Sequence, residues 1–284
     1  MRLVYVNGEY VPETAACVSI FDRGFLFADS VYEVTLVLDG RLVDFSGHMA
    51  RLRRSLGELD MPFSLTEENL LAIHRELIKR NAISEGLVYL QVTRGVADRD
   101  FVFPEESTPN TVVLFTQKKT ILDSPAAARG QHIVTLDDLR WRRCDIKTVQ
   151  LLYPSMAKMQ AKAQGADDAW LVKDGFITEG SSNNAFIVTT DGTIVTRDIS
   201  TDILRGITRE AVLLCAGNLQ LQLEERPFTV EEIEKAAEAF STSASSLVNP
   251  VVTVNGKRIG SGKPGSITAH LRQIYVERGR ASAI

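Results

Sequence analysis

The sequence predicts two domains of the α/β class, of the α+β type, in which helices interrupt antiparallel sheet. Two observations carry this prediction: repeated hairpin-turn dipeptides, and apolar residues at helical spacing between them. The length of 284 residues fits about two domains of ordinary size. We expect domains at 1–120 and 131–284. Residues 121–130 are interpreted as an interdomain linker, because a run of alanines after Pro125 closes on Gly130.

Hairpins are predicted at five dipeptides, each flanked by β-prone residues: Asn7-Gly8, Asp39-Gly40, Asp174-Gly175, Asp191-Gly192 and Asn255-Gly256. Each suits a type I′ turn, in which both central residues need positive φ. The strands expected along the chain are Val31–Leu38, Arg41–Val43, Leu87–Thr93, Thr111–Thr116, Gln131–Leu136, Ala169–Val172, Ala185–Thr189 and Ile194–Thr196. The connection Gly95–Asn110 has no predicted structure of its own, and loops of that length are more often functional than idle.

Helices are predicted where apolar residues recur at the spacing of one helix face. Four helices are expected at Gly47–Leu59, Pro154–Gln164, Gly206–Ala216 and Ser266–Arg278, with Gly217 as the stop of the third. A fifth begins at Ser64–Glu67, which resembles a capping box, and runs to about Asn81. A short sixth helix follows a cap at Thr229–Glu232.

Composition excludes several classes of function. Apolar residues make up 44% and charged residues 24%, as in a globular protein with a sizeable core. A net charge of −4 gives no reason to expect a nucleic acid or an anionic membrane as partner. No run approaches the ~20 apolar residues that span a bilayer. The three cysteines, Cys17, Cys144 and Cys215, lie far apart without metal-site spacing, so we expect free thiols in a reducing cytoplasm.

Two residues point to cofactor chemistry. Lys147 has the apolar neighbours Ile146, Val149, Leu151 and Leu152, among which desolvation would disfavour its ammonium form, as a Schiff-base lysine requires. The alternative is a surface lysine with its stem on apolar residues and its head in water. Glu179 opens the small polar turn Gly180–Asn184. A carboxylate there could keep a ring nitrogen protonated and make the ring an electron sink, or could be a solvated turn acid.

Three further features suit a phosphate. The predicted helix start at Gly206 offers unpaired N–H groups and the positive end of the helix dipole, and Thr208 can add a hydroxyl. The hydroxyl-rich turn Phe240–Ser246 is a second set of donors. Arg51, on a helix, could bind a phosphate through two N–H groups. Most helix starts bind only water, and most helix arginines face solvent. The hydroxyl-rich turn is equally consistent with an ordinary serine-rich loop.

Together these segments resemble the fold-type IV pyridoxal-phosphate aminotransferases of the class IV, branched-chain aminotransferase-like superfamily, and most closely the D-amino-acid aminotransferases. The resemblance covers nearly the whole chain. The motifs that carry it, in order, are Tyr5–Gly8, Val18–Phe27, Val31–Val34, Gln91–Gly95, Arg140–Lys147, Thr178–Ser182 and Gly206–Arg209.

The resemblance implies a small N-terminal α/β domain and a large C-terminal domain that binds pyridoxal 5′-phosphate, with the cofactor between them. It implies that Lys147 holds the cofactor as a Schiff base and moves the proton between the substrate α-carbon and C4′. Glu179 would pair with the pyridine nitrogen, and Leu204 would pack beneath the ring. The residues implied for the phosphate are Arg51, Ile207, Thr208, Ser243 and Ala244. The substrate carboxylate would be bound by Tyr32 and by Arg99, the latter from the other subunit of a homodimer.

The sequence departs from the family pattern at three places. Phe101 stands where D-aminotransferases carry a histidine. The lost hydrogen bond to a charged group is worth about 1.5–3 kcal/mol, so carboxylate affinity would fall about tenfold or more. Ala28 replaces the usual glycine before Asp29, and Leu151–Pro154 replaces a commoner Leu-Leu-Gly run.

The resemblance therefore implies ping-pong transamination between a D-amino acid, such as D-alanine or D-glutamate, and 2-oxoglutarate or pyruvate. Four alternatives stay open. A branched-chain L-aminotransferase would carry an arginine-containing segment after Val31–Glu33, which is not seen. An (R)-amine transaminase would suit Phe101. A 4-amino-4-deoxychorismate lyase would use the same lysine for elimination. A catalytically dead cofactor-binding dimer would lack Lys147.

Overall fold

The computed structural model describes residues 1–284 and divides the chain into two compact units. Unit 1 consists of Met1–Thr120, Ile146–Gln150 and Ser282–Ile284, and unit 2 of Ile121–Asp145 and Leu151–Ala281. The short segment that carries Lys147 thus belongs to unit 1, although it lies far from the rest of that unit in the sequence. The division into domains at residues 121–130 stays a prediction. No helix is both long and apolar enough to cross a membrane.

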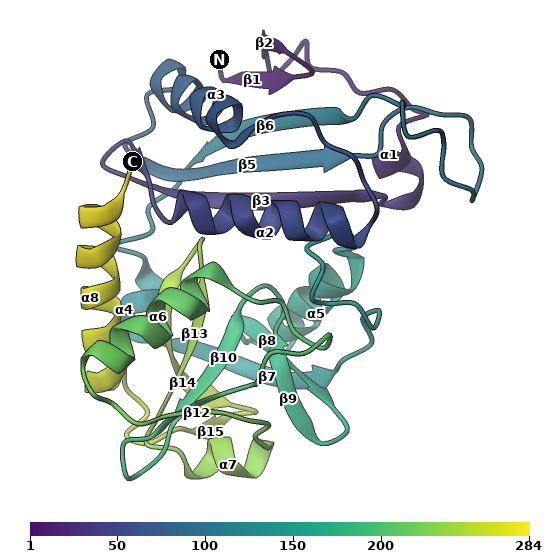
Figure 1. Cartoon of the computed structure of the whole chain (residues 1–284). Helices are drawn as coiled ribbons and strands as arrows, with labels where there is room; N and C mark the ends of the chain where they lie inside the picture. Colours follow the sequence, from purple (N-terminus) through teal and green to yellow (C-terminus); the bar gives the residue numbers. More distant parts are fainter. The chain divides into compact units, whose positions relative to one another are not determined.

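Unit 1 is built on a six-stranded sheet in which all neighbouring strands are antiparallel (Figure 1). The strand order is β2-β1-β6-β5-β3-β4. Its strands are β1 (Leu3–Val6), β2 (Glu9–Pro12), β3 (Ser30–Leu38), β4 (Arg41–Leu42), β5 (Glu85–Thr93) and β6 (Thr111–Lys118), and its helices are α1 (Arg23–Phe27), α2 (Phe45–Glu58) and α3 (Glu67–Arg80).

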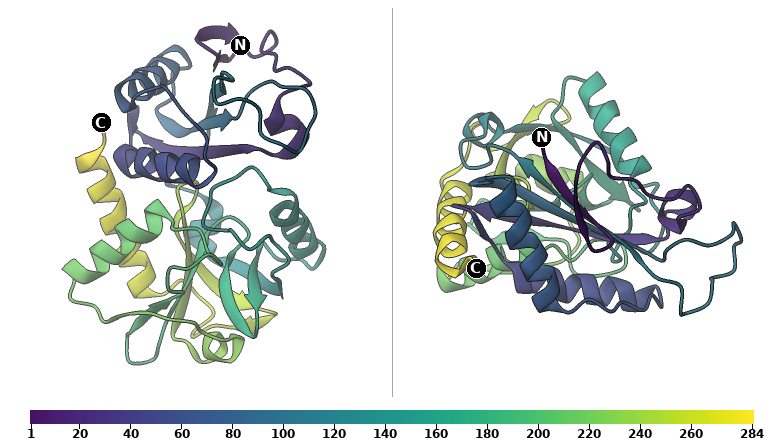
Figure 2. Two further views of the ribbon diagram at one scale, coloured as in Figure 1. Left: turned by 45° about the vertical axis from the view of Figure 1, so that its right-hand side comes forward. Right: turned by 90° about the horizontal axis from the view of Figure 1, so that it is seen from above.

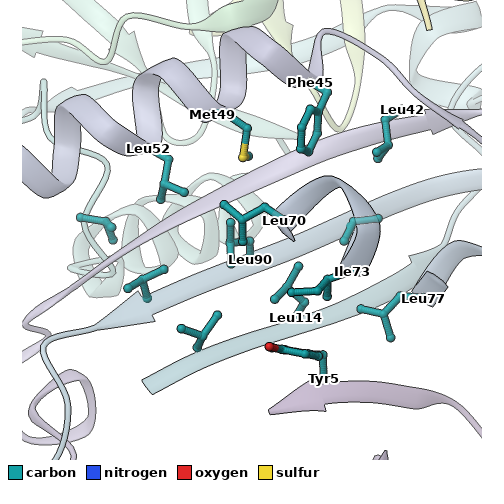
Figure 3. Close-up of a cluster of buried hydrophobic side chains, with 14 of the residues drawn as sticks. Tyr5, Leu42, Phe45, Met49, Leu52, Leu70, Ile73, Leu77, Leu90 and Leu114 are labelled. Atoms are coloured by element: carbon teal, nitrogen blue, oxygen red, sulfur yellow. The ribbon is translucent and has the colours of Figure 1, made fainter. Parts of the chain in front are cut away.

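The core of unit 1 lies between this sheet and helices α2 and α3 (Figure 3). The buried residues recur at helical spacing on the helices and at every second position on β5, as these two geometries require. They include Phe45, Met49, Leu52 and Leu56 on α2, Leu70, Ile73 and Leu77 on α3, and Val88, Leu90 and Val92 on β5. Helix α3 starts two residues later than a Ser64–Glu67 box would place it, because the capping box is formed by Thr66 and Asn69.

Unit 2 contains a nine-stranded mixed sheet, ordered β12-β11-β10-β13-β14-β7-β8-β9, with β15 paired to β14. Strand β7 is parallel to both of its neighbours, so antiparallel pairing is less dominant than the hairpin dipeptides alone indicate. The strands are β7 (Gln131–Asp137), β8 (Asp168–Lys173), β9 (Phe176–Gly180), β10 (Asn184–Val188), β11 (Ile194–Thr196), β12 (Leu223–Glu225), β13 (Glu238–Ser243), β14 (Leu247–Val254) and β15 (Lys257–Arg258).

Five helices belong to or begin in unit 2: α4 (Pro125–Arg129), α5 (Leu152–Ala163), α6 (Ile207–Asn218), α7 (Val230–Lys235) and α8 (Ser266–Ser282). Helix α4 lies inside the segment expected to be a linker, with Ser124 accepting a hydrogen bond from the Ala127 N–H group as its cap. Helix α6 continues through Gly217, which was expected to end it. The predicted cap at Thr229–Glu232 is confirmed as a capping box.

Four of the five hairpin dipeptides have positive φ at both residues, as type I′ turns require. The exception is Asp191-Gly192, where only Gly192 has positive φ, at 89°. The connection there is longer: the Thr189 and Thr193 backbones pair by an N–H···O bond of 2.9 Å, and the Thr189 hydroxyl accepts from the Thr193 N–H at 3.0 Å. These bonds provide partners for the backbone groups of the loop, so the loop closes with only one residue, Gly192, in the left-handed region.

Candidate active site

Lys147 lies on a short extended segment that pairs with the start of β3. The Tyr32 N–H donates to the Lys147 carbonyl at 3.0 Å, and the Val149 N–H donates to the Ser30 carbonyl at 3.3 Å. Lys147 itself is half-buried, and its Nζ lies 4.1 Å from the centroid of the Tyr32 ring. The structure therefore brings together the predicted cofactor lysine and one of the predicted substrate-binding residues.

Tyr32 belongs to an aromatic row on one face of the unit 1 sheet. Its ring stacks on Tyr89 at 5.5 Å, and Tyr89 stacks on Phe115 at 4.7 Å. Burial raises the pKa of the Tyr89 phenol, so it stays protonated and donates to Gln91 at 2.9 Å. Because side chains alternate along a strand, the next residue of β3, Glu33, lies on the opposite face, toward α2.

Glu33 forms a buried ion pair with Arg51, the residue predicted to bind the phosphate. Its side chain is fully buried, and its two oxygens accept from Arg51 Nε at 2.8 Å and Nη2 at 2.7 Å. His48 Nδ1 lies 2.7 Å from the same carboxylate. Burial alone would raise the pKa of Glu33, but Arg51 and His48 lower it to about 2. The carboxylate is therefore ionised at neutral pH, and Nδ1 of His48 is the donor.

The sequence indicates Arg51 as a candidate phosphate ligand, which stays a prediction, but does not identify its partners Glu33 and His48. A signal was present for Glu33, since it is the one charged residue within the strand Ser30–Leu38. An acid in a strand that is otherwise almost wholly buried requires a charged partner, because an unpaired buried carboxylate is very costly.

Glu179, at the end of β9, is 4% exposed and accepts three hydrogen bonds. Oε1 accepts from Arg140 Nη1 at 2.5 Å, and Oε2 accepts from Asn184 Nδ2 at 3.0 Å and from the Leu204 N–H at 3.1 Å. Burial raises the pKa of the Glu179 carboxyl, and the contacts with Arg140 and the Leu204 N–H oppose that effect. Arg140 also binds Asp138 through Nε and Nη2, at 2.9 and 2.7 Å. Of this set, the sequence predicted Glu179 and Leu204 but not the roles of Arg140, Asp138 and Asn184.

Asn184 connects Glu179 to the start of α6. Its Nδ2 donates both to Glu179 and to the Leu204 carbonyl, at 3.0 and 2.9 Å. A Cβ on Gly206 would lie 2.1 Å from Asn184 Oδ1, so this approach requires glycine there. Gly206 caps α6 without a side-chain hydrogen bond, which leaves the first N–H groups of Ile207 and Thr208 to other acceptors.

The hydroxyl-rich turn follows β13 in unit 2. Ser243 Oγ lies 2.7 Å from Ser246 Oγ and 3.3 Å from Ser245 Oγ, and Ala244 is half-buried between them. The preceding residue, Thr242, pairs in register with Asn184 on β10, and its buried hydroxyl has no hydrogen-bond partner. Asn184 on β10 thus connects three features of unit 2. Its side chain binds Glu179 and the residues before α6, and its backbone pairs with the strand that leads into the hydroxyl-rich turn.

Arg99 and Phe101 lie on the connection between β5 and β6 and are exposed, Phe101 by 78%. The Arg99 guanidinium lies 5.4 Å from the Phe27 ring and 5.7 Å from the Phe101 ring. Neither Arg99 nor Phe101 contacts Tyr32, whose ring neighbours are Tyr89 and Lys147. Within one chain, the residues predicted for the substrate carboxylate therefore form two separate groups.

Comparison with known proteins gives consistent matches. A sequence model of the family described as amino-transferase class IV matches residues 30–254. The D-alanine aminotransferase of Staphylococcus haemolyticus is 36% identical over 275 residues, which cover 96% of each sequence. That of Bacillus licheniformis is 39% identical over 271 residues, or 95% of this chain and 94% of that protein.

Solved structures of branched-chain amino acid aminotransferases share the fold. The enzyme from Escherichia coli superposes with a TM-score of 0.87 at 22% identity, covering 98% of this chain and 94% of that one. A second such enzyme, from the organism abbreviated T.th., was solved with pyridoxamine 5′-phosphate. It gives a TM-score of 0.88 at 26% identity and covers 97% and 93% of the two chains.

These matches confirm the α/β fold of the fold-type IV enzymes and the resemblance predicted from the sequence. Enzymes of this family depend on pyridoxal 5′-phosphate. The side chains present fit that cofactor: a lysine amine, a buried acid for a cationic ring nitrogen, and N–H and hydroxyl donors at a helix start and a serine turn for a phosphate. The chain belongs to the class IV aminotransferases and is a pyridoxal-phosphate-dependent aminotransferase.

Proposed function

We propose that the enzyme moves the amino group of a D-amino acid, such as D-alanine or D-glutamate, to 2-oxoglutarate or pyruvate in a ping-pong cycle. The observation that supports this choice is the 36–39% identity to D-alanine aminotransferases over at least 95% of the chain. The branched-chain enzymes superpose well but share only 22–26% of their residues with it.

Lys147 is the proposed catalytic residue. The cofactor, when bound, supplies an electron sink for the negative charge that develops at the substrate α-carbon. The Lys147 amine would hold the cofactor covalently and move the proton at that carbon. Its Nζ lies over the Tyr32 ring, 4.1 Å from the centroid, a contact that limits the directions the side chain can take.

The other cofactor contacts are proposed from the positions of their donors and acceptors. Glu179 would pair with the pyridine nitrogen, and Leu204 would pack against the ring. The phosphate would be held by Arg51, Ile207, Thr208, Ser243 and Ala244. Support comes from the buried Glu179 carboxylate and from the α6 start, which has no side-chain cap.

We also propose a homodimer in which Arg99, beside Phe101, reaches the substrate carboxylate of the partner subunit. Within one chain Arg99 makes no contact with Tyr32, so a second copy is the source that would combine them. Unit 1 exposes a set of large apolar side chains that a partner would cover. These are Val18, Ile20, Phe21, Phe25, Val96, Phe101, Val102 and Phe103.

A second candidate activity is the transamination of (R)-amines, which lack a carboxylate. Phe101 favours it, because its ring cannot donate a hydrogen bond to a carboxylate and is 78% exposed beside Arg99. A branched-chain L-aminotransferase is a third candidate, from the structural likeness alone.

The test follows the visible absorbance of the cofactor-loaded protein when D-alanine, L-alanine, L-leucine or (R)-1-phenylethylamine is added. We expect the fastest change with D-alanine. A faster change with L-alanine or L-leucine contradicts the D-specific proposal, and a faster change with the amine favours the second candidate.

Lys147→Ala should abolish turnover, whereas Lys118→Ala is a matched control, because Lys118 is an exposed lysine of unit 1 outside the proposed site. Ordinary activity in the Lys147 variant would disprove the catalytic assignment.

A further inference from the structure

Strands β5 and β6 are connected by residues 94–110, and all but the first of these form a segment that we call the 95–110 loop. The loop extends outward from the unit 1 sheet (Figure 2). It has no regular structure of its own and carries Arg99 and Phe101. A catalytic or binding side chain on such a loop is useful only if the loop keeps its shape, because ordering it at each turnover costs conformational entropy. The structure contains a set of side chains that could do this.

A buried cluster of three charges lies at the base of the loop. Asp29 Oδ2 accepts from Arg23 Nε and from Arg94 Nε, both at 2.8 Å. The exposed fractions of these side chains are 3% for Arg23, 8% for Asp29 and 7% for Arg94. Burying two guanidinium groups with one carboxylate is expensive unless their other N–H groups are also satisfied.

Both arginines also donate to backbone carbonyls on the two sides of the cluster. Arg23 Nη1 donates to the Asp100 carbonyl at 2.7 Å and to the Val102 carbonyl at 3.4 Å. Arg94 donates to the carbonyls of residues 59–60, just past the end of α2, at 2.7 and 2.9 Å. The cluster thus ties the two residues that flank Phe101 to the helical layer of unit 1.

Aromatic side chains reinforce the same connection. The Arg94 guanidinium lies 3.7 Å from the centroid of the Phe103 ring, which belongs to the loop. Arg23 lies 4.6 Å from the Phe27 ring, and Arg99 lies 5.4 Å from that ring. Cations at these distances from a ring face are attracted to it. Arg99 is therefore linked to the buried cluster through Phe27.

Close backbone contact also fixes the base of the loop. The Arg23 N–H donates to the Gly95 carbonyl at 2.9 Å. Gly95 has a φ of 103°, and a Cβ there would lie 2.0 Å from the Pro109 carbonyl oxygen. The two ends of the loop therefore meet at a position that only glycine allows.

We propose that Arg23, Asp29 and Arg94 are positioning residues for substrate binding, which hold the 95–110 loop so that Arg99 meets the substrate carboxylate. The inference rests on the proposed function, since it takes from it the role of Arg99. Release of the loop should weaken carboxylate binding and leave the chemical step at Lys147 unchanged. The expected signature is a higher KM for D-alanine with little change in kcat.

The test compares Asp29→Asn with Asp98→Asn in the cofactor-loaded enzyme. Asp98 is an exposed acid of the same loop outside the cluster, so its variant makes the same chemical change without touching the arginines. Hydrogen exchange of the loop amides, read by mass spectrometry, should accelerate in the Asp29 variant alone. Its KM for D-alanine should rise about tenfold, the effect of one weakened hydrogen bond to a charged group.

Phe103→Ala covers the case in which the Asp29 variant does not fold. Phe103 is 55% exposed, so its loss leaves no buried charge unpaired while it removes the contact with Arg94. It should show the same two changes, faster loop exchange and higher KM.

Arg99→Ala distinguishes the role of Arg99 in carboxylate binding from the positioning role of the buried cluster. If its KM for D-alanine equals that of the wild type, the role assigned to Arg99 is wrong, and the positioning role is wrong with it. If Arg99→Ala raises KM but the folded Asp29 and Phe103 variants keep wild-type KM, the positioning role alone is overturned, whether or not loop exchange increases.

Discussion

Replacing Glu33 by glutamine should destabilise the protein by about 3 kcal/mol at pH 7. The fully buried carboxylate receives two N–H groups of Arg51 and one of His48. Removing one partner of a buried ion pair costs about 3–5 kcal/mol. The same contacts lower the pKa of Glu33 from 4.5 to about 2, which corresponds to about 3 kcal/mol of stabilisation at neutral pH.

The pH dependence follows from the direction of that change. Because the pKa of Glu33 is lower in the folded than in the unfolded protein, its stabilisation is complete above about pH 4.5 and is lost as the pH falls toward 2. The difference in unfolding free energy between the wild type and Glu33→Gln should therefore be about 3 kcal/mol at pH 7 and smaller by about 2 kcal/mol at pH 3.

Urea unfolding of the cofactor-free proteins, followed by circular dichroism at both pH values, measures this difference. Glu9→Gln is a suitable control, because Glu9 is an exposed strand acid and its loss should change stability by less than about 0.5 kcal/mol. A difference below about 1 kcal/mol at pH 7, or one that does not shrink in acid, would refute the reasoning.

Three further predictions concern backbone strain and the second buried acid. Ala28→Gly should stabilise the protein by about 0.5–1 kcal/mol in thermal denaturation, since Ala28 has a φ of 56° and the strain relieved exceeds the entropy glycine adds to the unfolded chain. Gly95→Ala should lower stability by more than about 2 kcal/mol in the same assay, because the added Cβ meets the Pro109 carbonyl. Arg140→Gln should raise the pKa of Glu179 further, so the acid limb of the kcat/KM profile moves to higher pH. An unchanged limb would mean that Arg140 does not influence that carboxyl.

Most of the secondary structure could be predicted because its causes are local. An Asn-Gly or Asp-Gly pair determines a tight turn through the φ values of two residues, and four of five such pairs behave this way. The fifth, Asp191-Gly192, differs because the Thr189 hydroxyl caps its loop. The parallel pairing of β7 could not be predicted, since both partners, β8 and β14, are chosen by packing across the sheet.

In the candidate site, too, local features could be predicted from the sequence, whereas contacts between distant residues could not. The motifs around Lys147 and Glu179 are contiguous, so a single sequence reveals them. The hydrogen bonds that hold the acids join residues far apart in the chain, such as Arg140 to Glu179 across 39 positions. No periodicity or spacing specifies such a pair. Its presence follows only from the cost of burying a carboxylate alone.

Glu33 and Glu179 are both buried carboxylates in contact with an arginine, but the pKa of Glu33 is lowered and that of Glu179 is raised. Arg51 gives two N–H groups to Glu33 and His48 gives a third, and these contacts outweigh burial, so the pKa of Glu33 falls. Burial raises the pKa of Glu179, and Arg140 offsets less of that rise because it gives two N–H groups to Asp138 and only one to Glu179. The charge of Asp138 adds to the rise. Glu33 is therefore a fixed charge, suited to holding an arginine in place. At Glu179 burial outweighs the contact with Arg140, and the proposed cationic ring nitrogen beside that carboxylate would add stabilisation of the ionised form that Arg140 alone does not supply.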